Sequence, residues 1–89
     1  MNYALQEYLE IKREHLGYNE YRVLEALLDG PLDRDCLCGQ LEMNRTTCYD
    51  QLAKLMRKGI VKKWRKALPI KGRPREWWEV RDEFLEGLS

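Results

Sequence analysis

Long apolar runs are absent from this chain of 89 residues, 35% of which are charged. A membrane-spanning helix needs about 18–20 consecutive apolar residues, so no membrane partner is expected. The sequence also has no basic and then apolar start of the kind that a secretory signal peptide carries. We therefore expect a cytoplasmic protein whose three cysteines remain reduced.

Metal ligands and catalytic groups are scarce. His15 is the only histidine, and the cysteines lack the paired C-x₂-C spacing that is typical of zinc sites. No base is placed to activate a nucleophile, and no group is recognisable that would stabilise an oxyanion. The sequence therefore predicts no metal, no cofactor and no enzymatic activity.

The three cysteines are predicted to have structural roles. Cys36 and Cys38 cannot bond to each other from one helix, because their Cβ vectors diverge. Cys38 and Cys48 are expected to be small core residues that face each other, with a disulfide between them only if the host is a hyperthermophile. Cys36 is expected to be more exposed and able to link two chains.

The length and the 44% content of hydrophobic residues suit one folded domain over residues 1–89. So small a domain has little room for an enclosed pocket of about 300 Å³, so no small-molecule effector is expected. The net charge of +1 hides an uneven distribution, because residues 61–81 contain eight Lys or Arg against two Asp or Glu, a local charge of +6. Such a patch is typical of proteins that bind phosphate backbones, although lysines also protect strand edges.

Apolar periodicity and capping residues predict an α+β fold that is mostly helical. Gly17 is expected to end the first helix, and Asn19 to cap a second helix that stops at Gly30-Pro31. Asp33 and Asn44 are expected to cap the two helices that follow. The predicted elements are helices at 2–16, from Asn19, at 33–41 and at 44–58 with Gly59 as the C′ residue, strands at 60–68 and 76–80 around a loop at 69–74, and a short helix at 82–89.

A short helix, a tight connection and a capped helix make a helix-turn-helix unit. The predicted organisation is an N-terminal helix at 1–16, a three-helix core at 17–60, a two-stranded hairpin at 60–81 and a short C-terminal helix at 82–89. The run from Leu37 to Val61 resembles winged helix-turn-helix transcription regulators, the TrmB type of archaea most closely and the MarR type more loosely. The matching residues are Arg45, Thr46, Tyr49, Asp50, Leu52, Leu55, Lys58, Gly59, Ile60 and Val61.

This resemblance implies double-stranded DNA as the partner, and an archaeal or archaeal-virus origin. The chain departs from the family pattern at Cys48, where Val is usual, and at Glu42, where a turn glycine is common. It also has no counterpart of the effector domain that larger TrmB-like regulators carry.

Helical geometry indicates which residues of 44–58 would enter a major groove. If Cys48 is central to the buried face, then Thr46, Asp50, Ala53 and Arg57 point outward at 100° per residue. The first turn suits phosphates, because helix N-termini attract anions. The residues expected to contact DNA are Asn44, Arg45, Thr46, Thr47, Tyr49, Asp50, Lys54, Arg57, Arg65, Lys71, Arg73 and Arg75.

The hairpin tip contains Lys71-Gly72-Arg73-Pro74-Arg75, which resembles the core of an AT-hook. Gly72 permits a close backbone approach, and Arg73 gains from the negative potential of a narrow minor groove. On the second strand, Trp78 is expected to pack on the helices, and Trp77 to pair across the hairpin or to cover basic side chains.

The N-terminal helix carries an apolar stripe that a small core is not expected to absorb, so we predict a homodimer on a pseudo-palindromic operator. The predicted contact residues are Leu5, Tyr8, Leu9, Phe84, Leu85 and Leu88. The predicted function is a sequence-specific transcription regulator, by default a repressor, with helix 44–58 in the major groove and residues 71–75 at the minor groove or backbone. The alternatives are a protein–protein interaction module, which has no need of the +6 hairpin, and a non-specific architectural DNA binder.

Overall fold

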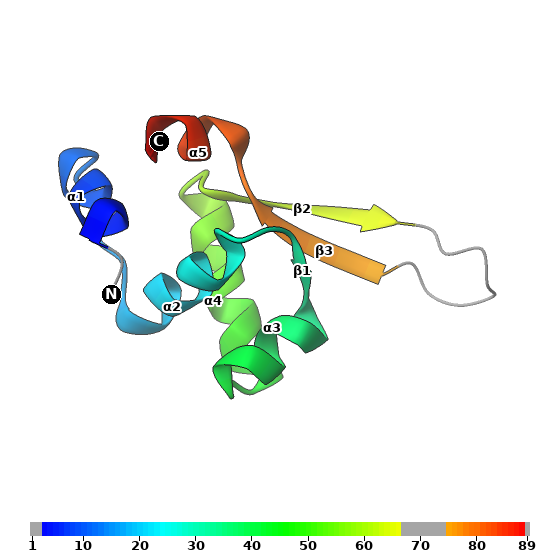
Figure 1. Ribbon diagram of the computed structural model, residues 1–89. Helices are drawn as coiled ribbons and strands as arrows, with labels where there is room; N and C mark the ends of the chain where they lie inside the picture. Colours follow the sequence, from blue (N-terminus) through cyan, green and yellow to red (C-terminus); the bar gives the residue numbers. More distant parts are fainter. Residues whose placement is uncertain (1–2, 67–74, 89) are drawn as a thin grey trace.

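The structure is a computed structural model that describes residues 3–66 and 75–88. Figure 1 shows the helices gathered at one end, with a hairpin extending away from them. This arrangement confirms the predicted α+β, mostly helical fold class. The elements are α1 (Tyr3–Ile11), α2 (Tyr18–Leu27), β1 (Leu32–Asp33), α3 (Arg34–Leu41), α4 (Arg45–Arg57), β2 (Val61–Lys66), β3 (Arg75–Val80) and α5 (Asp82–Leu88).

The sheet has three strands in the order β1-β3-β2, all antiparallel, where the sequence predicted only a hairpin. Strand β1 pairs Leu32 with Trp78 and Asp33 with Trp77. Two residues are too few to show the alternation that reveals a strand, so sequence reasoning missed β1. Strand β1 matters for the arrangement of the site, because it runs directly into α3 and joins the helix-turn-helix to the hairpin.

The core lies where α2, α3 and α4 meet the sheet. As predicted, one side of α4 is buried along its length, and Trp78 and Val80 of β3 face the helices. These residues form one hydrophobic cluster with the two N-terminal helices. The buried apolar residues are Leu5, Leu9, Val23, Leu24, Leu27, Leu37, Cys48, Leu52, Leu55, Ile60, Val61, Trp78, Val80 and Phe84.

Capping residues begin and end α4 where the sequence indicated. The Asn44 side chain accepts a hydrogen bond of 2.8 Å from the Thr47 N–H, which satisfies one of the free donors of the first turn. Gly59 has φ +75°, and the Ile60 N–H donates to the Leu55 carbonyl oxygen at 3.1 Å. Glycine adopts this left-handed conformation without steric cost, so the helix ends there.

The first helix is shorter than predicted, and Gly17 does not end it. Arg13 adopts a left-handed conformation with φ 57°, and the Glu14 N–H donates to the Leu9 carbonyl at 2.9 Å. This is the hydrogen-bond pattern that closes a helix C-terminus. Gly17 is instead the N-cap of α2, so the prediction that Asn19 caps this helix is wrong.

The apolar stripe of α1 is absorbed within the chain, contrary to the reasoning behind the predicted dimer contact. Leu5, Leu9 and Phe84 are buried, and the rings of Tyr8 and Phe84 meet edge-on at 5.0 Å. Leu85 and Leu88 are half-buried against the same core. Two large apolar side chains of α1 remain exposed, those of Tyr3 (76%) and Ile11 (78%).

A partly buried ion pair joins the start of α2 to the end of α4. Lys58 Nζ lies 2.7 Å from Glu20 Oε2 and donates a second hydrogen bond to the His15 carbonyl. The Gly17 N–H donates to Glu20 Oε1 at 3.3 Å. Burial raises the pKa of Glu20, but the hydrogen bonds from Lys58 and Gly17 outweigh it and lower the pKa overall.

Replacing Glu42 by glycine should stabilise the protein. Glu42 ends α3 with φ 52°, a conformation that costs energy for any residue with a Cβ. We expect Glu42→Gly to raise the free energy of unfolding by about 0.5–1 kcal/mol, measured by urea denaturation. The matched variant Gly59→Ala should lower it by about 1 kcal/mol, and equal effects of the same sign would contradict this account of the two turns.

Replacing Glu20 by glutamine should make the protein less stable in a pH-dependent way. A lowered carboxyl pKa stabilises the fold above the ordinary value of 4.5, and this contribution is lost as the pH falls through the folded-state value. At pH 7 we expect Glu20→Gln to cost about 1–3 kcal/mol in the free energy of unfolding. The difference from the unmodified protein should shrink below pH 4.5, whereas the exposed control Glu7→Gln should show almost no difference at any pH.

Candidate nucleic-acid interface

The outer face of α4 is polar and open to solvent. Thr46, Asp50, Ala53 and Arg57 are all exposed, on the side opposite the buried line of Cys48, Leu52 and Leu55. Lys54 is also exposed, whereas Thr47 is half-buried. The structure thus brings these predicted contact residues onto one helical surface.

The N-terminus of α4 is also exposed, at Asn44, Arg45 and Thr46. The oxygen of the Asn44 side chain is occupied by the cap, which leaves its amide group as a hydrogen-bond donor. Arg45 Nη2 lies 3.6 Å from Asp35 Oδ1. The free backbone N–H groups and the partial positive charge of a helix N-terminus make this end suitable for an anion.

Tyr49 is predicted to contact DNA, but in the structure its side chain also contacts two other elements of the protein. Its hydroxyl accepts a hydrogen bond of 2.6 Å from Arg34 Nη1. Its ring meets the ring of Trp78 edge-on at 5.8 Å, so it fills the corner between α4 and β3. This contact could not be predicted from the sequence, because it depends on how two separate elements pack.

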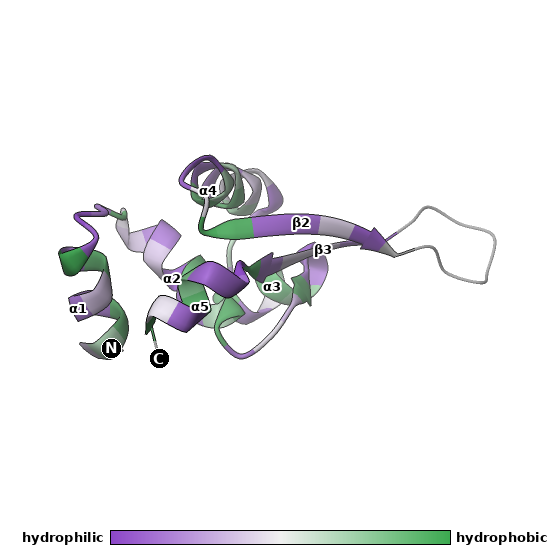
Figure 2. Ribbon diagram, turned by 90° about the horizontal axis from the view of Figure 1, so that it is seen from above, coloured by the Kyte–Doolittle hydropathy of each residue, from purple (hydrophilic) through white to green (hydrophobic). Residues whose placement is uncertain are grey.

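A largely apolar groove of about 350 Å³ runs between α4 and the hairpin. Figure 2 shows α4 end-on beside the root of β2, which is hydrophobic at that root and hydrophilic beyond it. Lys63 and Arg57 contribute the positive charge of this groove. Lys63 is in register with Trp78 and is exposed, so strand alternation could have identified it as facing α4. The groove is lined by Tyr49, Leu52, Ala53, Met56, Arg57, Lys63 and Trp78.

The opposite face of the hairpin carries a pair of stacked indoles. Trp64 and Trp77 are cross-strand partners, with ring centroids 5.7 Å apart and planes 13° from parallel. The two rings cover each other and rigidify the hairpin. The predicted pairing of Trp77 across the hairpin is therefore confirmed.

Much of the positive charge on the described strands is paired with local carboxylates. Arg65 Nη2 lies 2.9 Å from Glu76 Oε1, and Lys62 Nζ lies 3.4 Å from Glu79 Oε1. Arg75 Nη1 lies 3.3 Å from Asp33 Oδ2. The tip residues Lys71 and Arg73, with the loop expected at 69–74, lie outside the described residues.

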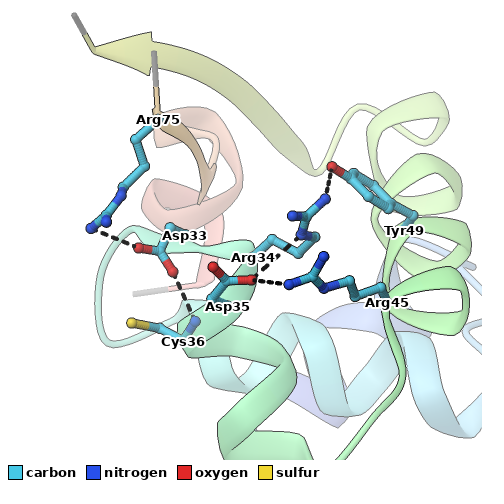
Figure 3. A network of polar contacts seen from close by, with 7 residues as sticks. All are labelled: Asp33, Arg34, Asp35, Cys36, Arg45, Tyr49 and Arg75. Atoms are coloured by element: carbon cyan, nitrogen blue, oxygen red, sulfur yellow. Dashed lines mark hydrogen bonds and ion pairs between the residues drawn. The ribbon is translucent and has the colours of Figure 1, made fainter. Parts of the chain in front are cut away.

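A polar network at the start of α3 connects the two parts of the predicted surface (Figure 3). Asp33 caps α3 through a 2.8 Å hydrogen bond from the Cys36 N–H and also binds Arg75. The hydrogen bond from Cys36 lowers the pKa of Asp33, burial opposes this, and the charge of Arg75 lowers it further. Asp33 therefore stays ionised between α3 and the hairpin.

The three cysteines are free thiols. Cys48 is buried, Cys38 is half-buried and Cys36 is exposed, which matches the predicted order of exposure. Burial and a hydrogen bond with Cys38 raise the pKa of Cys48 to about 12. The two thiols thus face each other across α3 and α4, as expected, without a disulfide.

Among residues 3–66 and 75–88, no group of three His, Cys, Asp or Glu side chains is positioned to hold a metal ion. Within the same residues, no helix is long and apolar enough to cross a membrane.

Comparison with known proteins places the fold. No protein-family model and no curated protein matches the sequence, but solved structures do. The transcriptional regulator PcaV from Streptomyces coelicolor, in complex with its natural ligand, is 29% identical with a TM-score of 0.69, over 84% of this chain and 52% of PcaV. A PadR family transcription regulator from Clostridium difficile is 17% identical with a TM-score of 0.68, over 81% of this chain and 80% of its own.

A third match is ZitR from Lactococcus lactis, a zinc-responsive MarR family member that is 15% identical with a TM-score of 0.69. It matches over 83% of this chain and 49% of its own. This chain has the winged helix-turn-helix fold. In that fold α3 and α4 are the helix-turn-helix and the β2–β3 hairpin is the wing. The chain spans about half the length of PcaV.

The thiol of Cys48 should be protected until the protein unfolds. Burial and the contact with Cys38 raise the pKa of Cys48 to about 12, so almost none of this thiol is ionised at pH 8, and the thiolate is the reactive form. We expect an aromatic disulfide reagent at pH 8 to modify exposed Cys36 first and Cys48 only in denaturant. Cys36→Ser should remove the fast phase and Cys48→Ser should not. Equal rates for all three thiols would contradict the structure.

Proposed function

We propose that this protein is a double-stranded DNA-binding transcription regulator, with α4 in the major groove and the tip of the wing at the minor groove or backbone. The observation that carries the proposal is the exposed polar face of α4, which lies beside a wing whose sequence is basic. Thr46 and Thr47 can hydrogen-bond base edges or contact a thymine methyl group. Arg45, Lys54 and Arg57 can contact phosphates.

The groove between α4 and β2 supports this mode of binding. Lys63 and Arg57 place a cation on each wall, and Ala53 and Met56 add apolar surface on the side of α4. A DNA backbone combines charged phosphates with apolar deoxyribose faces, so one strand passing between helix and wing meets both kinds of surface. Lys63, one of the basic residues that the sequence places on the wing, is therefore a contact residue in this proposal.

Repression by occlusion, sequence specificity and a homodimer are parts of the proposal that rest on the sequence. If the protein dimerises, Tyr3 and Ile11 are the large apolar side chains of α1 left free to make the contact. The TrmB likeness and an archaeal origin remain predictions. The absence of an effector is also a prediction, and the similar protein PcaV was solved with a ligand.

The second candidate is a protein–protein interaction module, which the intramolecular pairing of Lys62, Arg65 and Arg75 favours. A wing whose charges are satisfied internally has less to offer a phosphate. The tip sequence, with Lys71 and Arg73, favours DNA.

Two single lysine substitutions, one on α4 and one beyond the end of α1, test the proposal. Fluorescence anisotropy should show that the unmodified protein binds a duplex with steep salt dependence. Lys54→Ala on α4 should weaken binding and reduce the slope of log K against log salt by about 0.9, the value for one phosphate contact. Lys12→Ala removes the same charge beyond the end of α1 and should leave both quantities unchanged.

Arg73→Ala tests the wing. It should reduce any preference for A·T-rich over G·C-rich duplexes, because an arginine gains most in a narrow A·T minor groove.

Equal losses from Lys54→Ala and Lys12→Ala would indicate non-specific attraction to the whole protein. The absence of binding at low salt would contradict the proposal and favour a protein partner.

A further inference from the structure

Two carboxylates at the start of α3 each hold an arginine that the proposed DNA surface would use. Asp35 Oδ1 lies 3.6 Å from Arg45 Nη2, at the first residue of α4, and 3.7 Å from Arg34 Nε. Asp33 Oδ2 lies 3.3 Å from Arg75 Nη1, at the first residue of β3. Figure 3 shows both pairs beside each other, between the helix and the wing.

The two ion pairs differ in their exposure to solvent and in how far the rest of the protein fixes the carboxylate. The Asp33 side chain is 9% exposed, and its other oxygen caps α3 at Cys36, so its position is fixed. The Asp35 and Arg45 side chains are 73% and 70% exposed, so water and salt screen that pair. In both pairs, one guanidinium nitrogen faces the carboxylate, which leaves other donors of the arginine available.

We propose that Asp33 and Asp35 are selectivity residues, which restrain Arg75 and Arg45 so that they do not bind phosphate indiscriminately. This inference rests on the proposed DNA-binding function. The side chain of an unrestrained arginine can reach phosphates at many positions along the DNA backbone. It therefore strengthens binding to every duplex alike. An arginine held by a carboxylate contacts phosphate only at the one position that its remaining donors reach. A duplex seated in the correct register supplies that position, and a random duplex does not.

Substitution by asparagine separates the restraint from the cap. Asparagine is as good an N-cap as aspartate, so Asp33→Asn keeps the hydrogen bond to Cys36 and removes the charge and the acceptor oxygen that bind Arg75. Circular dichroism and thermal unfolding should confirm that the Asp33→Asn, Asp35→Asn double variant stays folded. Glu7→Gln, Glu10→Gln is the matched control, because it removes two exposed carboxylates from α1, at the end of the molecule away from the wing.

The probes are a duplex selected by the unmodified protein from a random-sequence pool and a scrambled duplex of the same composition. For the double variant, we expect affinity for the scrambled duplex to rise about threefold to tenfold, as one exposed and one partly buried ion pair allow. Its salt dependence should steepen by up to about 0.9 for each released arginine. Affinity for the selected duplex should rise less, so that the ratio of the two falls at least about threefold.

A double-mutant cycle separates restraint from simple repulsion. Asp35→Asn should strengthen binding to the scrambled duplex in the normal background and not in an Arg45→Gln background. An unchanged affinity ratio, an equal effect from the α1 control, or an equal effect with and without Arg45 would overturn the inference and leave DNA binding intact. If the unmodified protein bound no duplex, or enriched no sequence from the pool, the proposed specific function would fail, and this inference with it.

Discussion

The burial of Trp78 is the constraint on which the rest of the structure depends. This indole is almost fully buried on the central strand of the sheet, in register with Leu32 on one side and Lys63 on the other. Its ring contacts Tyr49 of α4 edge-on. A buried tryptophan contributes more apolar area than any other side chain of this core, so it fixes the angle between the wing and α4.

Several features of the candidate interface follow from that angle. The groove between α4 and the hairpin has Trp78 at its base, and Lys63 faces the helix because it is the cross-strand partner of Trp78. The space beside Asp33, Arg34 and Arg75 is lined by the same indole and by Tyr49. The polar network of α3 and the apolar groove therefore share the packing contact between Tyr49 and Trp78.

Elements specified by local chemistry could be predicted from the sequence. Asn44 begins α4 because its side chain caps the first turn. Gly59 ends α4 because a residue without a side chain adopts the left-handed conformation that closes the helix. The buried side of α4 followed from its periodicity, and so did its exposed outer face. The inward and outward directions of Trp78 and Trp77 followed from strand alternation.

Features that depend on tertiary contact could not be predicted. Arg13 ends α1 in a conformation that glycine usually adopts, and two-residue β1 exists only because β3 offers it a partner. The sequence predicts a dimer contact for the apolar residues of α1, because nothing in it shows that α5 returns to cover them. The pairing of Tyr49 with Arg34, and of two candidate DNA-binding arginines with Asp33 and Asp35, likewise arises where separate elements meet.

The central claim is that the outer face of α4 and the wing form one DNA-binding surface. The most direct measurement is a nuclear magnetic resonance titration of the isotopically labelled protein with a duplex. The account predicts that backbone amide shifts concentrate in residues 44–57, 61–66 and 75–80, with little change in α1. Shifts confined to α1 and α5, or no shifts at low salt, would contradict it.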